Sequence, residues 1–517
     1  MNAGVLRVPD LESAAGVCTE LRAAVHIACK RIVDESSSGS LEQHRNAADL
    51  MPLENESPLH LLRFAELRQY DRHFEVKQMK IACGSEHTAF VERGGFVATA
   101  GSDSLFQLGY RSSEVDSPNV SCSIPMPVQD SGWTVSAVSA GRAHTLFISN
   151  GAAFAFGCAC HFSKQKVGLL LQDCIWLTHF DVKLIAVSTR MVRCAQPLSA
   201  ILQLCKAASC HVSAATQLGV GDKRTRLEPC RIELPGRVTS ISAGHFHSVA
   251  TTDQGETFVW GSARNSKLGP HAGEKLKPAL LTSTEHGFPC ATSASAGGHF
   301  TCVTCSDGRL LITGFQNAVV RNATPMLARC VSPRKPFVLY AAAGEAHAVV
   351  LLDDGSVVCF GCNAQGQCGT GMLSTWESVG VKACGALLHE RGVQVDAGDV
   401  HSMCVTASRN TIIWGFCGEG DRLGNPSIIG RLKPAIVPSV RGQAAQAAAG
   451  RNHSAILTTD GSIRTFGWNS NGMLGIHTCS EQHEPRTVPR FQCKLPFSRH
   501  LPSMTTLTGQ AQLQRRE

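Results

Sequence analysis

The segment AGRNHSAILTTDGSIRTFGWNSNGMLG, residues 449–475, carries the pattern that decides the fold. It opens with Gly450-Arg451-Asn452-His453, runs through apolar residues to Asp460-Gly461, and continues to a second apolar run that ends at Phe466-Gly467. An Asp-Gly pair between two short β-rich runs indicates a tight hairpin turn, because glycine readily takes the positive φ that such turns need. A polar loop then leads to Leu474-Gly475. The segment therefore predicts a β-hairpin followed by a loop.

The pattern recurs along the 517-residue chain. Six copies of Gly-x-x-His are Gly84 to His87, Gly141 to His144, Gly244 to His247, Gly344 to His347, Gly398 to His401 and Gly450 to His453. In a seventh copy, Gly297-Gly298-His299-Phe300, Phe300 takes the histidine position. The second apolar runs end at Gly101, Gly157, Gly261, Gly314, Gly361, Gly415 and Gly467. Leu-Gly follows at Leu108, Leu218, Leu268, Leu423 and Leu474, with Cys368-Gly369 as a variant and no counterpart in the fourth copy.

The repeat length of about 52 residues holds a four-stranded sheet, and sheets repeated radially cover the faces that each would leave exposed alone. We therefore predict an all-β fold, a seven-bladed β-propeller over residues 76–491. A partly helical N-terminal extension with a flexible linker occupies residues 1–75, and residues 492–517 form a C-terminal tail.

The order Ala-Gly-x-x-His, Asp-Gly, Trp-Gly or Phe-Gly, then Leu-Gly resembles the regulator of chromosome condensation repeat over residues 76–491. In this family, seven repeats close a propeller. In its best-known member, acidic and histidine side chains of the Gly-x-x-His loops contact a small GTPase and promote nucleotide release. The resemblance implies matching loop positions for Glu86, His299 and Asp399. The chain departs from the pattern where apolar residues precede the histidine: Ala143, Phe246, Ala346 and Val400.

The second repeat is about twice as long as the others, since His144 and His247 lie 103 positions apart. Joining Ala159 directly to Ala214 restores the spacing between the strand-end glycine and Leu218-Gly219 that other repeats show. Residues 160–213 are thus an insert with no repeat signature. Two interpretations stay open: a genuine surface insertion, or non-coding sequence translated through a gene model. A transcript that spans the codons for Ala159 and Ala214 distinguishes them.

The N-terminal extension predicts two helices joined by a polar linker over residues 35–56. Asp10 caps the first, which runs to about Val33, and its apolar stripe is Leu11, Ala14, Cys18, Leu21, Val25, Ala28 and Ile32. Ser57-Pro58 begins the second, which ends near Tyr70. These helices either pack on the propeller or bind a partner. Residues 1–75 hold 8 Lys and Arg against 12 Asp and Glu, so we do not expect direct binding to nucleic acid.

The variable residues of the Gly-x-x-His loops form a predicted ring on one rim. The partner-binding candidates are Glu86, Arg142, His299, Glu345, Asp399, Arg451 and Asn452, with Ser85 and His245 beside them. The repeated glycines and histidines are assigned structural roles, in which each histidine bonds backbone groups left unpaired at a strand end. Cys302-x-x-Cys305 and Cys359-x-x-Cys362 have zinc-like spacing, but strand residues three apart point to opposite faces. We expect no metal, no cofactor and no catalytic residue for covalent chemistry.

These observations predict a protein-interaction propeller. The first hypothesis, which rests on the family resemblance, is a small-GTPase regulator that acts as a guanine nucleotide exchange factor. The alternative is a non-catalytic scaffold or adaptor that binds partners through the rim or the N-terminal helices. The 23 cysteines are scattered through apolar segments, and no run of 18 uncharged apolar residues is present. We therefore expect a monomer without a membrane span, in the cytoplasm, the nucleus or both.

Overall fold

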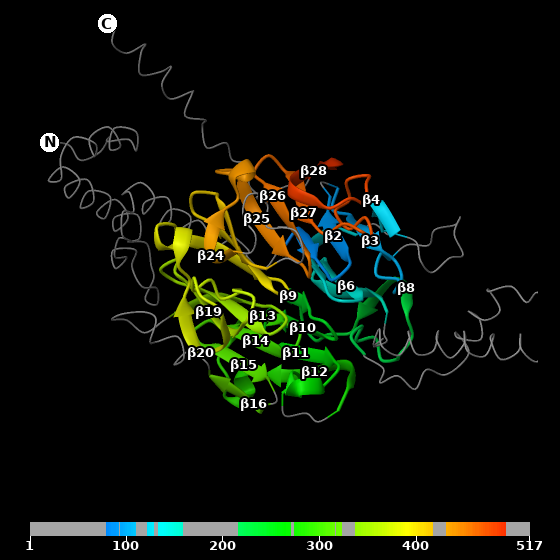
Figure 1. Cartoon of the computed structure of the whole chain (residues 1–517). Coiled ribbons are helices and arrows are strands. Elements are labelled where there is room, and N and C mark those ends of the chain that lie inside the picture. Colours follow the sequence, from blue (N-terminus) through cyan, green and yellow to red (C-terminus); the bar gives the residue numbers. More distant parts are fainter. Residues whose placement is uncertain are drawn as a thin grey trace, which may run out of the picture.

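The computed structural model describes residues 79–92, 94–109, 121–128, 133–158, 216–269, 273–315, 317–322, 337–416 and 431–492. These residues form seven four-stranded antiparallel sheets, each made of four strands that are consecutive in the sequence. The sheets stand as blades around a common axis (Figure 1). The prediction of an all-β, seven-bladed propeller is confirmed.

The blades are numbered in chain order. Blade 1 contains β1 (Ile81–Cys83), β2 (His87–Val91), β3 (Val97–Ser102) and β4 (Ser121–Pro127). Blade 2 contains β5 (Val135–Ala140), β6 (His144–Ser149), β7 (Ala152–Gly157) and β8 (Arg226–Ile232). Blade 3 contains β9 (Val238–Ala243), β10 (His247–Thr252), β11 (Thr257–Gly261) and β12 (Lys275–Thr282). Blade 4 contains β13 (Ala291–Ala296), β14 (Phe300–Cys305), β15 (Leu310–Gly314) and β16 (Asn317–Asn322).

Blade 5 contains β17 (Val338–Ala343), β18 (His347–Leu352), β19 (Val357–Asn363) and β20 (Ser374–Lys382). Blade 6 contains β21 (Gly392–Ala397), β22 (His401–Thr406), β23 (Thr411–Gly415) and β24 (Arg431–Ile436). Blade 7 contains β25 (Ala444–Ala449), β26 (His453–Thr458), β27 (Ser462–Gly467) and β28 (Gln482–Gln492). Short 3-10 helices are η2 (Arg264–Ser266), η3 (Thr284–His286), η4 (Gly385–Leu388) and η5 (Pro438–Val440).

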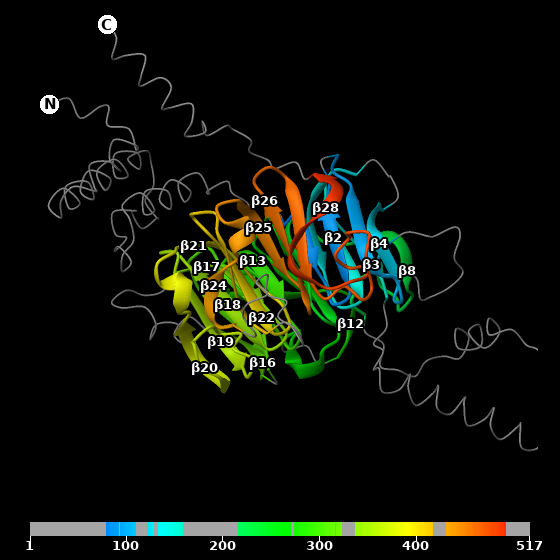
Figure 2. The same cartoon turned by 45° about the horizontal axis from the view of Figure 1, so that its top comes forward.

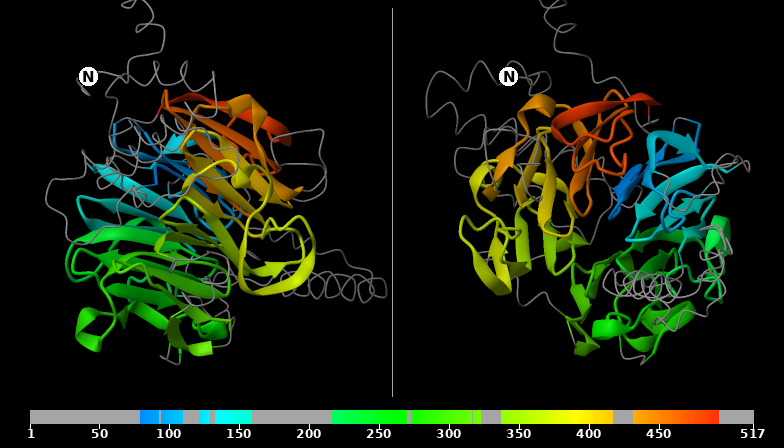
Figure 3. Two further views of the ribbon diagram at one scale, coloured as in Figure 1. Left: turned by 90° about the vertical axis from the view of Figure 1, so that its left-hand side faces the viewer. Right: turned by 45° about the vertical axis from the view of Figure 1, so that its right-hand side comes forward.

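The first strand of every blade lines the axis, and neighbouring first strands contact one another all the way around. The series closes where β25 contacts β1, and Figures 2 and 3 show blade 7, in orange and red, beside blade 1, in blue. The apolar core lies between blades rather than inside one. At the closing seam, for example, Ile81 and Phe90 of blade 1 pack with Ala455 and Leu457 of blade 7. Closure thus buries both faces of each sheet.

In blades 2, 4 and 7 tight turns join the second and third strands. Asn150 and Gly151 have φ of 52° and 78°, so both central residues of this turn are left-handed, as a two-residue hairpin requires. At Asp307-Gly308 and Asp460-Gly461, only the glycine has positive φ. A Cβ at the strand-end glycine Gly101 would lie 2.4 Å from the carbonyl oxygen of Glu86, so no larger residue fits there.

Several sequence predictions lie outside the described residues: the extension (1–75), the insert (160–213), Leu423-Gly424 and all but the first residue of the C-terminal tail (492–517). The chain on either side of the insert is described. Gln217 Nε2 donates to the carbonyl oxygen of Cys158 over 2.7 Å, which brings the flanks of residues 159–215 together in blade 2. Within the described part of the chain, no helix is long and apolar enough to cross a membrane.

Candidate functional site: a rim of seven loops

The loops between first and second strands lie on one rim and are tied together by backbone hydrogen bonds. In each loop the N–H after the repeated glycine donates to the carbonyl oxygen of the corresponding glycine in the next blade, over 3.0–3.4 Å. The described residues complete this ring: Ser85 to Gly141, Arg142 to Gly244, His245 to Gly297, Gly298 to Gly344, Glu345 to Gly398, Asp399 to Gly450 and Arg451 to Gly84. A Cβ on Gly84 would lie 2.5 Å from the oxygen of Gly141. Glycine is required because neighbouring backbones approach so closely.

The repeated histidines bind the next blade. His347 Nε2 lies 2.9 Å from Ser402 Oγ, and that hydroxyl donates to the carbonyl oxygen of Gln367 over 2.8 Å. A hydroxyl has one proton, so Ser402 accepts from His347 and the histidine carries its proton on Nε2. The other pairs are His87 with Thr145, His144 with Ser248, His247 with Thr301, His401 with Ser454 and His453 with Thr88.

These hydroxyl partners differ from the expected ones, because the histidines were predicted to bond backbone groups at a strand end. Burial lowers the pKa of His347 to about 3 and that of His401 to about 4, so these rings are neutral. Each neutral imidazole uses its Nε2 in a hydrogen bond to a hydroxyl of the next blade, and this bond holds the two blades together. The repeated histidines therefore form hydrogen bonds between neighbouring blades.

Blade 4 lacks this hydrogen bond, and the residue at the hydroxyl position of blade 5 differs as well. Phe300 occupies the histidine position, and the residue opposite, in blade 5, is Ala348. Both are fully buried in one apolar cluster. A hydroxyl at position 348 would face a ring without a hydrogen-bonding atom, so the seam between blades 4 and 5 replaces a polar pair by an apolar one.

Three candidate residues meet near the axis. His245 Nε2 of blade 3 lies 2.8 Å from Asp399 Oδ1 of blade 6, and Arg451 Nε of blade 7 lies 3.5 Å from Asp399 Oδ2. Burial alone would raise the pKa of Asp399, but His245 and Arg451 outweigh it and hold that pKa below its ordinary value. The carboxylate is ionised and accepts only, so His245 Nε2 carries the proton. The contact joins loops of non-adjacent blades across the axis.

The other candidates surround this centre. Asn265 Nδ2 lies 2.7 Å from His299 Nδ1, and burial lowers the pKa of His299 although Glu345 opposes the shift. The Arg142 guanidinium lies 5.0 Å from the Phe246 ring centre. Glu86 Oε2 is 3.5 Å from Asn471 Nδ2, so Glu86 lies with a blade 7 loop rather than with Asp399.

Lys267 is a charged residue of this rim that the repeat motif did not predict. Its Nζ donates to the carbonyl oxygen of Gly298 over 3.1 Å and lies 5.6 Å from the Phe246 ring centre. Burial lowers its pKa to about 8. A signal was available, because Lys267 stands before Leu268-Gly269 where other repeats have Gln107, Gln217 and Gln367.

The first strands carry polar side chains that satisfy the backbone of the next blade. Ser139, Ser242 and Ser295 each accept the N–H of an alanine in the following blade, over 2.9–3.0 Å. In blade 6 the equivalent residue is Asp396, whose Oδ2 accepts Ala449 N over 2.7 Å. Burial raises the pKa of Asp396 to about 7. These residues and the repeated glycines of the loops line one central cavity.

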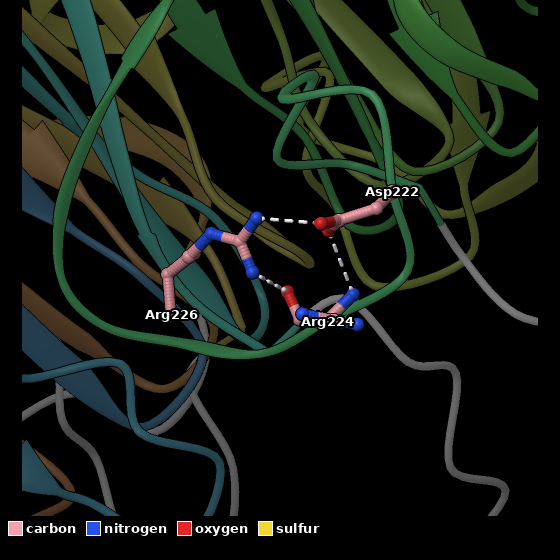
Figure 4. A network of polar contacts seen from close by, with 3 residues as sticks. All are labelled: Asp222, Arg224 and Arg226. Carbon is pink, nitrogen blue, oxygen red and sulfur yellow. Dashed lines mark hydrogen bonds and ion pairs between the residues drawn. The ribbon is translucent and has the colours of Figure 1, made fainter.

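At the outer edge of blade 2, a short loop is ordered by one carboxylate. Asp222 accepts the Arg224 N–H over 3.0 Å and pairs with the Arg226 guanidinium over 2.7 Å, and Arg226 donates back to the Arg224 carbonyl oxygen (Figure 4). The pair is exposed enough that it contributes little stability. Among the described residues, no group of three or more His, Cys, Asp or Glu is arranged to bind a metal ion.

Comparison with known proteins gives the rim a family context. Models of the regulator of chromosome condensation (RCC1) repeat match residues 214–251, 341–367 and 444–472. The regulator of chromosome condensation of Xenopus laevis is 32% identical over 299 residues, which cover 53% of this chain and 70% of that protein. The chain belongs to the regulator of chromosome condensation repeat family.

Two further proteins are similar to this chain over part of their length. The E3 ubiquitin-protein ligase HERC2 of Mus musculus is 27% identical over 296 residues, or 54% of this chain, and the chain spans 6% of that protein. The crystal structure of Prp20p from Saccharomyces cerevisiae, titled for its binding to Gsp1p and histones, covers 79% of this chain and 76% of its own at 14% identity and a TM-score of 0.42.

Proposed function

We propose that the rim binds a small GTPase and that this chain acts as a guanine nucleotide exchange factor without covalent chemistry. The observation that carries the proposal is the ionised carboxylate of Asp399, held on a rigid ring of loops by His245 and Arg451. A GTPase holds its nucleotide through a lysine and a magnesium ion at the phosphates. A carboxylate presented there repels the phosphates and competes for those cations, so it favours release.

Release of labelled GDP from a panel of purified small GTPases tests this function. We expect acceleration by the wild type, and a loss of about tenfold or more, ~1.4 kcal/mol of activation free energy, for Asp399→Ala and Glu86→Ala. Asp399→Asn keeps a hydrogen-bond acceptor for His245 without the charge and is expected to lose activity as well. Glu285→Ala is the matched control, because Glu285 is an exposed carboxylate in η3, away from the rim. No acceleration of any GTPase would remove the proposal.

The second candidate is an adaptor without exchange activity. Two observations favour it: Asp399 is already paired, and apolar residues stand before the histidine at Ala143, Phe246, Ala346 and Val400. Affinity purification with the full chain and with residues 76–517 distinguishes the two binding surfaces. Loss of partners on truncation would place binding in the N-terminal extension, and retention would place it in the propeller.

A further inference from the structure

The central cavity contains one carboxylate that lies below the rim. The cavity has a volume of about 120 Å³ and extends from the glycines of the rim loops, along the first strands, to Ser240, Tyr340 and Gln394. Asp396 of β21 lies between these two levels, two residues before Gly398. A water molecule occupies about 30 Å³ in the liquid, so the cavity can hold a small ligand together with a few waters.

Asp396 faces blade 3 across the axis. At the rim, His245 of blade 3 and Asp399 of blade 6 are bonded across the axis, and each directly follows the glycine of its loop. Ser242 and Asp396 stand three residues before them, on β9 and β21, and both line the cavity. The Asp396 carboxylate therefore lies at the level of Ser242, below the contact that joins the two loops.

The interblade hydrogen bond at this level does not need a charge. In blades 2, 3 and 4 the equivalent residue is a serine, whose hydroxyl accepts the N–H of an alanine in the next blade. Asp396 makes the same bond to Ala449 and also accepts the N–H of Ala397. Because a neutral serine is sufficient for this contact, the interblade bond does not explain the negative charge at position 396.

No described residue supplies a positive charge that compensates this carboxylate. Within the described part of the chain Asp396 forms no ion pair, whereas Asp399 at the rim is paired with both His245 and Arg451. An ionised carboxylate that is taken out of water is costly unless a counter-charge accompanies it. The cavity provides the space for such a counter-charge.

The cavity wall also carries hydroxyl groups without partners. Ser240 lines the cavity with an exposed fraction of 5%, and its hydroxyl has no hydrogen-bond partner among the described residues. The Tyr340 hydroxyl likewise has none, and its pKa is raised by burial and then by the charge of Asp396, which places the two groups near each other. Buried polar groups are normally hydrogen-bonded, so these hydroxyls indicate a polar occupant of the cavity.

We propose that the central cavity binds one hydrated alkali cation, potassium or sodium, with Asp396 as its counter-charge and the cavity hydroxyls bonded to its water shell. Carboxylate, hydroxyl and water oxygens are the ligands of hard cations. One uncompensated carboxylate balances one positive charge, whereas calcium sites use several carboxylates. The cation site does not depend on the proposed exchange function, because it lies below the rim.

The first test compares thermal melting of the full chain in four forms. They are the wild type, Asp396→Ser, Asp396→Asn and, as a control, Glu285→Gln, which removes an exposed carboxylate in η3. Asp396→Ser copies blades 2, 3 and 4, so it keeps an acceptor for the Ala449 N–H while it removes the charge. The salts are potassium, sodium, calcium, magnesium and choline chloride at an ionic strength of about 0.15 M, at about pH 8, above the pKa of about 7 that burial gives Asp396.

Potassium or sodium should stabilise only the chains that keep the Asp396 carboxylate. We expect the melting temperature of the wild type and of Glu285→Gln to lie about 2 °C higher in the alkali salt than in choline chloride. Both Asp396 variants should show a difference below about 0.5 °C. An equal difference in the Asp396 variants would overturn the site, and stabilisation by calcium or magnesium alone would overturn the assignment of a single charge.

A second measurement locates the ion. Crystals of the wild type and of Asp396→Ser are soaked in thallium(I) acetate, because thallium(I) replaces potassium at oxygen sites and scatters anomalously. We expect an anomalous difference peak in the central cavity beside Asp396 in the wild type and no such peak in the variant. A wild type without this peak would overturn the proposal, and that result would leave the GDP-release test of the rim unaffected.

Discussion

Replacing Ser402 by alanine tests the hydrogen bond between His347 of blade 5 and Ser402 of blade 6. The hydroxyl accepts from His347 Nε2 and donates to the Gln367 carbonyl oxygen, which also receives the Trp414 indole N–H over 2.8 Å. The carbonyl therefore stays paired in the variant, whereas the His347 N–H becomes a buried donor without a partner. Such a group costs about 1–3 kcal/mol, so we expect Ser402→Ala to lower the free energy of unfolding by about 2 kcal/mol.

The seam of blade 4 supplies the compensating change. His347→Phe combined with Ser402→Ala recreates the pair of Phe300 and Ala348, which is fully buried in the native fold. We expect the double variant to be more stable than the sum of the single effects predicts, with a coupling energy of about 1–2 kcal/mol. Urea unfolding followed by tryptophan fluorescence measures each variant, and Ser439→Ala, at an exposed position, is the control. An unchanged free energy of unfolding for Ser402→Ala, or strictly additive effects of the two single substitutions, would refute a stabilising bond between His347 and Ser402.

Two further predictions follow from burial and from chain geometry. Because burial lowers the pKa of His87, His144 and His453 to about 3, the unfolded chain binds these protons first as the pH falls. The free energy of unfolding should fall as the pH drops below about 6.5, by up to ~1.4 kcal/mol per pH unit for each histidine. Asp396 gives the opposite slope between its ordinary pKa of 3.8 and about 7, because its raised pKa lets the folded chain bind the proton first. Urea midpoints that stay flat between pH 7.5 and 4.5 would contradict this. Deletion of residues 160–213 should leave the melting temperature within about 3 °C, since the flanking residues Cys158 and Gln217 are hydrogen-bonded to each other, and an insoluble or unfolded deletion variant would count against it.

The sequence was sufficient to predict the blades but not their contacts. A short motif that recurs with similar spacing predicts equivalent sheets, and seven copies predict closure. The hydroxyl partners are also visible in the sequence, as the residues after the histidines, but they acquire meaning only once blade neighbours are known. Thr88, for example, is bonded to His453, which lies 365 positions away. The substitution of Ala348 opposite Phe300 then follows from the same geometry.

The contact between His245 and Asp399 had no sequence signal. It depends on the diameter of the ring and on side-chain direction at two non-adjacent loops, which the spacing of a motif does not determine. The packing at the fourth repeat was not predicted for a different reason. The fourth repeat visibly lacks Leu-Gly, but the packing of Phe315 between Phe300 and Trp376 depends on how blade 5 lies against blade 4.

A ring of seven similar loops offers a partner seven similar orientations, so specific recognition requires features that make the positions different. Two features of this rim do so. The bonds of Asp399 to His245 and Arg451 join blades 3, 6 and 7, and blade 4 has a short connection whose Phe315 ring stacks on Phe300. A partner that contacts both the Asp399 carboxylate and the short connection of blade 4 can dock in one orientation only.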